Sequence, residues 1–167
     1  MRLQPHGHCS QTARERRALL FAAVLPLWGS ASAASKSHLP LAVSLLDAMA
    51  QACTAGEPLL VLVSLDGCPF CKTVREQFLI PLREQSQVAM VQVDMRSQTK
   101  LQTFAGDASN HDAQVRAWDV QIAPTVLFFK HNGVEAAPRL IGLGTPDYYG
   151  GRLEDRWLQA RAATRVS

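Results

Sequence analysis

Residues 59–71 read Leu-Leu-Val-Leu-Val-Ser-Leu-Asp-Gly-Cys-Pro-Phe-Cys, and this stretch decides the fold. Its first part, Leu59 to Leu65, is almost continuously apolar, which is typical of a central strand covered on both faces. The Asp66-Gly67 pair then predicts a turn, and a helical apolar spacing follows it. Two cysteines, Cys68 and Cys71, therefore lie between a buried strand and a helix.

The predicted helix, Lys72 to Leu82, separates the two sulfurs. Cys68 falls at or just before its first turn, with Pro69 at a position suited to the first helical residue, whereas Cys71 lies on the apolar face and points toward the core. Unpaired N–H groups and the positive end of the helix dipole favour a thiolate on Cys68. We expect Cys68 to be the nucleophile and Cys71 the resolving thiol. Pro81 is expected to kink or end the helix.

A single C-x-x-C pair is a weak signal, because it equally supplies half of a zinc site. A structural zinc site needs four ligands, and the sequence has no second C-x-x-C; His38, His111 and His131 are scattered and predicted to be solvated or locally hydrogen-bonded. A structural disulfide across two residues closes too small a loop to constrain the unfolded chain much. Redox exchange is the favoured interpretation, and copper handling by the dithiol stays open.

The composition fits one compact domain, since the chain has 167 residues of which 47% are apolar. Its formal charge of +3 comes from the N-terminal arginines, and the remainder is formally neutral. A balanced domain offers no broad electrostatic reason to bind nucleic acid or an anionic membrane surface. We therefore expect no nucleic-acid partner.

The N-terminal segment predicts a signal peptide, residues 1–33, ahead of a domain at 34–167. Basic residues up to Arg17 precede an apolar stretch, Ala18 to Trp28, and an Ala-Ser-Ala cleavage pattern that ends at Ala33. The apolar stretch is shorter than the roughly 20 residues of a spanning helix, so the mature form is predicted not to be membrane-embedded. The expected location is the periplasm or the outside of the cell. Cys9 would leave with the signal, and Cys53 is expected to be a small buried hydrophobe.

The remaining patterns alternate between helices and strands. The first is a helix over 39–54, whose apolar face is made of Leu39, Val43, Leu46, Ala50 and Cys53. A strand over 88–93, a loop with a short helix over 96–110 and a helix over 112–118 with an acidic cap follow. The chain then predicts strands at 126–129 and 139–143 around an Asn132-Gly133 turn, and a last helix from Gly150 or Gly151 with Leu153, Trp157 and Ala160 facing inward. Trp118 and Phe128 are predicted core residues, and Tyr148 and Tyr149 are predicted to pack at the surface or contact a partner.

From Leu59 to Gln159, the chain resembles the thioredoxin superfamily. The resemblance rests on Cys68-Pro69-Phe70-Cys71 followed by Lys72, on Ala123-Pro124-Thr125, and on the Asn132-Gly133 hairpin with Gly142. It implies an α/β fold of the thioredoxin type, with a central mixed β-sheet flanked by α-helices. The signal peptide and the segments 96–110 and 147–150 are most similar to exported bacterial thioredoxin-like proteins, including periplasmic thioredoxins associated with sulfur oxidation.

The resemblance also implies a site. Cys68 and Cys71 would be catalytic, and Pro69, Phe70, Ala123, Pro124 and Thr125 would form the substrate-binding surface. Pro124 would follow a cis peptide bond beside the dithiol, and Ala123 would offer backbone groups to an extended client segment.

Two departures from ordinary thioredoxin bear on how Cys71 is deprotonated and on whether the protein reduces or oxidises disulfides. Leu62 stands where the family often buries a carboxylate that helps to deprotonate the resolving thiol. Asp66-Gly67 replaces an aromatic residue before the motif, and Pro69-Phe70 replaces Gly-Pro within it. The negative charge of Asp66 opposes the helix dipole, and the central residues of the motif alter the redox potential.

The sequence thus predicts an exported thiol-disulfide oxidoreductase that reduces protein disulfides without a bound cofactor or metal. Its clients would be protein disulfides or dithiols, and a membrane electron donor would recycle it. The alternatives are a disulfide oxidase, a disulfide isomerase, or a redox-inactive module that binds peptides or handles metal.

Overall fold

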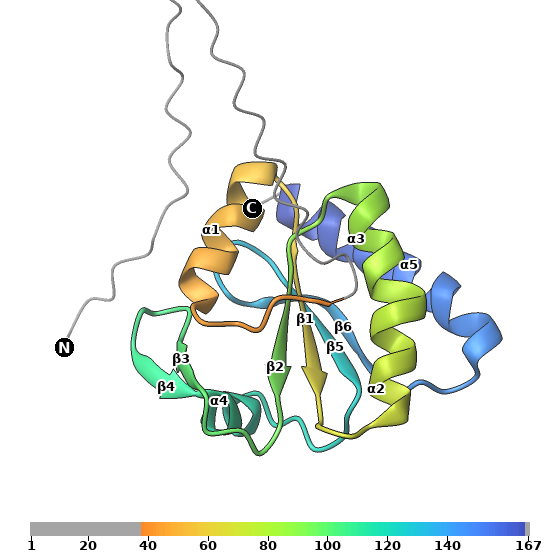
Figure 1. The fold of residues 1–167 in the computed structure, drawn as a ribbon. Coiled ribbons are helices and arrows are strands. Elements are labelled where there is room, and N and C mark those ends of the chain that lie inside the picture. Colours follow the sequence, from red (N-terminus) through yellow and green to blue (C-terminus); the bar gives the residue numbers. More distant parts are fainter. Residues whose placement is uncertain (1–37, 166–167) are drawn as a thin grey trace, which may run out of the picture.

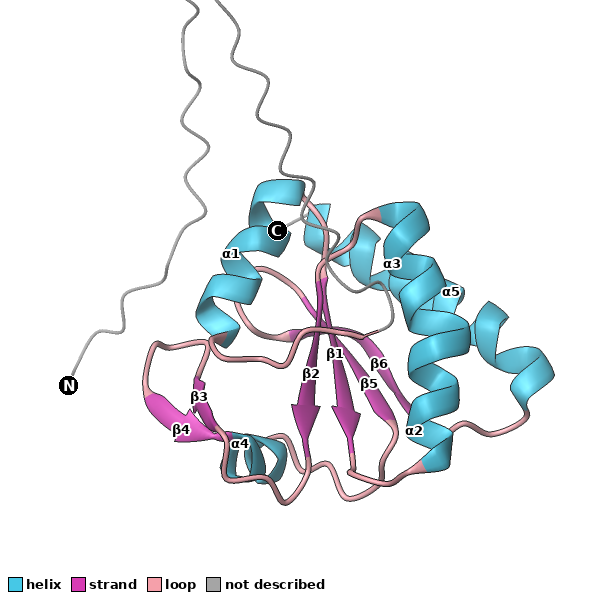
Figure 2. Cartoon of the chain, viewed as in Figure 1, coloured by secondary structure: helices cyan, strands magenta, loops and turns pink. Residues whose placement is uncertain are grey.

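The computed structural model describes residues 38–165, so the predicted signal peptide and Cys9 lie outside the described residues. A four-stranded sheet with helices on both faces forms the body of the molecule, and a two-stranded sheet flanks it (Figures 1 and 2). In chain order the elements are α1 (Leu45–Ala55), β1 (Leu59–Ser64), α2 (Pro69–Thr73), η1 (Val74–Leu79), α3 (Ile80–Ser86), β2 (Met90–Asp94), β3 (Lys100–Gln102), β4 (Ala108–Asn110), α4 (His111–Ala117), β5 (Thr125–Phe129), β6 (Glu135–Ile141) and α5 (Pro146–Arg165).

The central sheet is mixed, as predicted, with the order β2-β1-β5-β6. β1 pairs in parallel with β2 and antiparallel with β5, which in turn pairs antiparallel with β6. All six residues of β1 are buried, which confirms the central strand predicted from its apolar run. The parallel β1–β2 pair requires a crossover, and the helix that begins at the dithiol provides it.

The two faces of β1 contribute to two separate clusters of the core. Leu60 and Leu62 pack toward the helices that follow the dithiol and toward α5, in a cluster that includes Val74 and Tyr149. Leu59, Val61 and Val63 face the opposite side, with α1 and α4. Side chains alternate along a strand, so Ser64 belongs to the face of Leu60 and Leu62. Ser64, at the end of that face, lies under the continuous helix formed by α2, η1 and α3, which we call the dithiol helix.

The helix after the dithiol runs without a break through α2, η1 and α3. Of the two outcomes predicted for Pro81, a kink or an end of the helix, the end is therefore wrong. Residues 74–79 form a π-helical turn, in which the N–H of Ile80 donates to the carbonyl of Arg75, five residues earlier. A proline inside an α-helix removes one backbone hydrogen bond and clashes with the carbonyl four residues before it. The wider π turn relieves this clash, and the helix continues to Ser86.

Two other helices differ from their predictions. α1 begins only at Leu45, because the hydroxyl of Ser44 accepts the N–H of Asp47 as an N-cap, and its buried face is Leu45, Ala48, Met49 and Ala52. Val43 and Leu46 of the predicted face are 74% and 44% exposed, and Cys53 is half-buried. α4 is capped by the side chain of Asn110 rather than by an aspartate.

The segment 96–110 contains the β3–β4 hairpin instead of a short helix. α5 begins at Pro146 rather than at Gly150, which places Tyr149 within the helix, although Leu153, Trp157 and Ala160 face inward as predicted. β6 also begins earlier than predicted.

The segment before α1 pairs with the outer edge of β2. The N–H of Gln92 donates to the carbonyl of Pro40 at 2.8 Å, and the N–H of Ala42 donates back to the carbonyl of Gln92 at 2.9 Å. His111 is fully buried: its Nε2 lies 2.8 Å from the carbonyl oxygen of Ala42, and its Nδ1 accepts the N–H of Asp94. One imidazole thus connects this segment to β2 and α4. Among residues 38–165, no helix has both the length and the apolar character needed to cross a membrane.

Candidate active site

Cys68 is the N-cap of α2, directly before Pro69 at the first helical position, as predicted from the sequence. Its Sγ accepts a hydrogen bond from the backbone N–H of Cys71 at 3.1 Å. The residue is half-buried, so this sulfur is within reach of solvent. A sulfur that accepts a backbone N–H at a helix start is in a setting that stabilises negative charge.

Cys71 lies one turn further and is buried, with 1% of its surface exposed, which confirms its predicted orientation toward the core. Burial, together with the side chain of Cys68, raises the pKa of the Cys71 thiol from the ordinary 9.0 to about 11. A hydroxyl hydrogen bond from Ser64 and a backbone hydrogen bond from Leu65 act in the opposite direction. The two sulfurs of the free dithiol therefore have different surroundings: one is accessible, and the other is held as a neutral thiol.

The Ala123–Pro124 peptide bond is cis, as the family resemblance implied. Val63 pairs with Thr125 across β1 and β5, so this loop lies at the same end of the sheet as the dithiol. The carbonyl of Pro124 accepts the N–H of Gly142 at 2.7 Å, and the hydroxyl of Thr125 donates to the carbonyl of Ile122 at 2.7 Å. Thr125 is buried, so its side chain fixes the loop and is not presented at the surface, unlike what the resemblance implied for a binding residue.

The predicted substrate-binding residues differ in what they present at the surface. Pro69 and Phe70 are exposed, Ala123 is half-buried, and Pro124 is buried. Phe70 has 60% of its surface exposed, and Ile122, which the sequence interpretation did not single out, has 55%. Two large apolar side chains thus stand free at the end of the sheet that carries Cys68. The signal for Ile122 was its place directly before the Ala-Pro pair.

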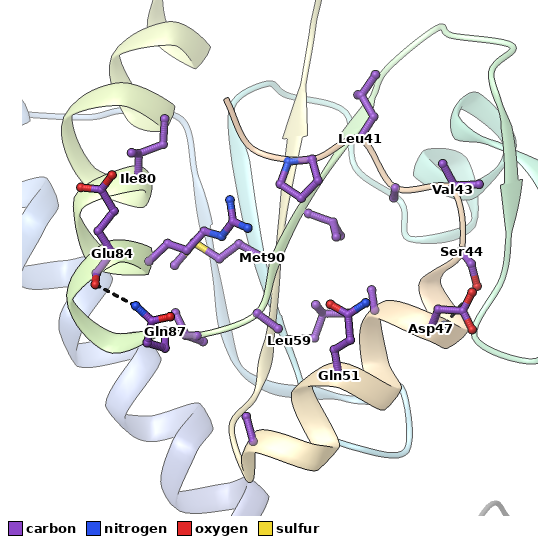
Figure 3. A pocket seen from close by; sticks show the side chains of 18 residues that line it. Leu41, Val43, Ser44, Asp47, Gln51, Leu59, Ile80, Glu84, Gln87 and Met90 are labelled. Carbon is purple, nitrogen blue, oxygen red and sulfur yellow. Dashed lines mark hydrogen bonds between the residues drawn. The ribbon is translucent and has the colours of Figure 1, made fainter. Parts of the chain in front are cut away.

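A hollow of about 950 Å³ opens beside Cys68, on the side of β2. Lys72 and Arg75 line it together with Cys68, at helical spacings of four and seven residues. Arg75 donates to the side-chain oxygen of Gln92 at 2.9 Å. A second hollow, of about 780 Å³, lies along the outer edge of β2 and has no cysteine in its lining. It is bounded by α1 on one side and by α3 on the other, with Met90 between them (Figure 3).

β1, the strand beneath Cys71, carries no aspartate or glutamate. Leu62 is buried within the apolar cluster, as its sequence position suggested, and Ser64 is the nearest polar residue along the same face of β1. Tyr149 is fully buried in this cluster, so the predicted surface role is wrong for Tyr149, whereas Tyr148 is 72% exposed. Sequence reasoning missed Tyr149 because it placed the start of α5 after it.

Within the described range, no cluster of three or more His, Cys, Asp and Glu side chains is arranged to hold a metal ion. His131 lies 3.3 Å from the carbonyl oxygen of Glu57, far along the chain from the dithiol. The chemistry that the described site offers is that of two thiols at a helix start.

Comparisons with known proteins agree with this geometry. Solved structures of similar fold include thioredoxin O2 from Arabidopsis thaliana in its oxidised state, which is 17% identical over 73% of this chain and 96% of that one, with a TM-score of 0.51. They also include mitochondrial thioredoxin 3 from Saccharomyces cerevisiae in its oxidised form, which is 16% identical over 73% of this chain and 99% of that one, with a TM-score of 0.50. No curated protein matches the sequence. The family model of the thioredoxin-like domain matches residues 45–157, which contain the dithiol and the cis-proline loop, and the chain therefore belongs to the thioredoxin-like family.

Proposed function

We propose that the protein is an exported thiol-disulfide oxidoreductase that reduces disulfides in client proteins. One observation carries the proposal: Sγ of Cys68 is accessible and accepts the N–H of Cys71, while the Cys71 thiol is buried behind it with its pKa raised to about 11. This asymmetry supports a role for Cys68 in the attack on the client and for Cys71 in the second step.

The reaction takes two displacements. The Cys68 thiolate attacks one sulfur of the client disulfide, a Cys68–client disulfide forms, and the other client sulfur leaves as a thiolate that takes up a proton. Cys71 then loses its proton and attacks Sγ of Cys68, and the second client sulfur leaves and is protonated. The client gains two electrons and two protons, and the protein ends as the Cys68–Cys71 disulfide.

Protein clients fit the exposed side chains around the sulfur. Phe70 and Ile122 provide apolar contact, and the exposed edge of the cis-proline loop lies at the same end of the sheet. Reduction is the favoured direction because the negative charge of Asp66 next to the motif offsets part of the stabilisation that the N–H of Cys71 gives to a Cys68 thiolate. A strong oxidant requires a strongly stabilised thiolate. A potential near about −270 mV in equilibrium with glutathione would support a reductant, and one near about −120 mV would assign the oxidase alternative.

Export, a periplasmic or secreted location and a membrane electron donor complete the proposal. Their support is the signal pattern that ends at Ala33 and the need to return the oxidised protein to the dithiol in an oxidising compartment. N-terminal sequencing of the protein from a secreting host should begin at Ala34. An association with sulfur oxidation rests on the sequence resemblance alone.

Trapping tests the roles of the two cysteines. The Cys71→Ala variant should accumulate mixed disulfides with client proteins through Cys68, because the resolving thiol is missing. The Cys68→Ser variant should accumulate none and should be inactive in a disulfide-reduction assay. Equal trapping by the two variants, or none by Cys71→Ala, would overturn the assignment.

A further inference from the structure

The proposed reaction leaves one difficulty, and the inference below rests on that proposed function. Cys71 must become a thiolate inside the protein, yet burial raises its pKa, and Leu62 on the strand beneath offers no polar atom. A thiolate in an apolar environment needs hydrogen-bond donors to compensate for lost water. Ser64 supplies one hydroxyl.

Tyr149 carries a second hydroxyl that has no other use in the described structure. The side chain is fully buried, and its Oη has no hydrogen-bond partner. Buried hydroxyls are nearly always paired, because leaving one unpaired costs the free energy of its lost hydration, so an unpaired one calls for an explanation.

Tyr149 lies on the same side of the sheet as the Cys71 face of the dithiol helix. Its ring packs against Phe78 with the centroids 4.8 Å apart, and it shares a core cluster with Leu62 and Val74. Val74 and Phe78 follow Cys71 along the helix at spacings of three and seven residues. Ser64 ends the same face of β1, so the two hydroxyls reach this region from two different elements.

Two electrostatic observations agree with this placement. Burial raises the pKa of Tyr149 well above its ordinary value, so the phenol keeps its proton and can act as a donor. A negative charge on Cys71 raises it further, whereas Arg152 lowers it, which means that the phenol and the Cys71 sulfur are close enough for their charges to interact.

We propose that the Tyr149 hydroxyl is the donor that stabilises the Cys71 thiolate during the second displacement. When Cys71 loses its proton to solvent, its sulfur accepts hydrogen bonds from the hydroxyls of Tyr149 and Ser64, then attacks Sγ of Cys68, and the client thiolate leaves. Tyr149 keeps its proton throughout and acts as a positioning residue. The two hydroxyls take the place of a charged group on the strand, which is absent at Leu62.

The neighbouring Tyr148 gives a matched control, because it lies next to Tyr149 in α5 but is exposed. Tyr149→Phe and Tyr148→Phe are each combined with Cys68→Ser, and the rate of Cys71 alkylation by iodoacetamide is followed from pH 7 to 12. Loss of a hydrogen bond to a charged sulfur should lower the rate about tenfold in Tyr149→Phe at every pH below the pKa of Cys71. Tyr148→Phe should match the parent.

Thermal unfolding of the reduced proteins separates this role from a purely structural one. Removing an unpaired buried hydroxyl while keeping the ring should not lower the melting temperature of Tyr149→Phe. An unchanged alkylation profile in Tyr149→Phe, or the same change in both tyrosine variants, would overturn the proposal.

The alkylation readout needs no client, so the two proposals can fail separately. A tenfold effect in Tyr149→Phe with no disulfide reduction by the unmodified protein would sustain the inference and sink the proposed function. Normal disulfide reduction by the unmodified protein, together with an unchanged Cys71 alkylation profile in Tyr149→Phe, would sustain the proposed function and overturn the inference.

Discussion

When the pH of the reduced protein is raised from 7 to 12, the buried thiol of Cys71 should lose its proton at a higher pH than an ordinary cysteine. A pKa of about 11 for Cys71, against an ordinary 9.0, leaves about one thiolate in 10⁴ at pH 7, where an unperturbed cysteine has about one in 10². Cysteine labelled with ¹³C at Cβ reports each thiol by NMR, and the signal of Cys71 should shift with a midpoint near 11. The same signal in urea should titrate near the ordinary value.

This difference also makes stability depend on pH, and its sign follows from proton binding. Between the two pKa values the unfolded chain has released the Cys71 proton and the folded protein retains it, so stability is full below about pH 9 and falls as the pH rises toward 11. The loss attributable to this thiol is about 2 kcal/mol. Urea unfolding of the reduced protein and of Cys71→Ala, compared from pH 8 to 11, isolates it. Parallel curves for the two proteins, or a Cβ midpoint at or below 9, would refute the reasoning.

Two further predictions concern buried polar groups away from the dithiol. His111→Ala should lower the free energy of unfolding by about 2–5 kcal/mol in urea titrations, because it leaves the N–H of Asp94 and the carbonyl of Ala42 unpaired. His131→Ala is the control and should lower it by less than about 1 kcal/mol. Similar losses in the two variants would contradict the bridging role of His111. Glu57→Gln should lower the free energy of unfolding by about 1–3 kcal/mol, because this buried carboxylate accepts the Nε–H of Arg161 at 2.7 Å. Glu135 is more exposed, so Glu135→Gln serves as the control and should change the free energy of unfolding by less than about 1 kcal/mol.

The fold around the dithiol was predictable because several local signals agree there. The apolar run of β1, the Asp66-Gly67 turn and the proline after Cys68 each have a specific meaning, and all place the cysteines between a buried strand and a helix start. Pro124 was placed correctly by resemblance, since nothing in the local sequence selects a cis bond.

The errors arise where two patterns compete or where contacts are distant. The first helix contains two apolar stripes, and packing against β1 buries the stripe of Leu45 and Ala48 rather than that of Leu46. The β3 and β4 strands have three residues each and are mostly polar, so they show no strand alternation.

The start of α5 was missed for a different reason. The Gly150-Gly151 pair suggested a boundary, but both glycines lie inside the helix, and Gly150 lies against the ring of Phe78. Tyr149 is buried because its ring packs against Phe78 and the core cluster beneath, and this contact could not be obtained from local propensity.

The pairing of Pro40 and Ala42 with Gln92 covers part of the outer edge of the central sheet. β2 is an outer strand, and free backbone groups on such a strand are a template for another chain to add to the sheet. The leading segment occupies those groups at Gln92, and the imidazole of His111 secures it. Removal of the residues up to Ala42 should therefore favour aggregation through this strand while leaving the dithiol itself intact.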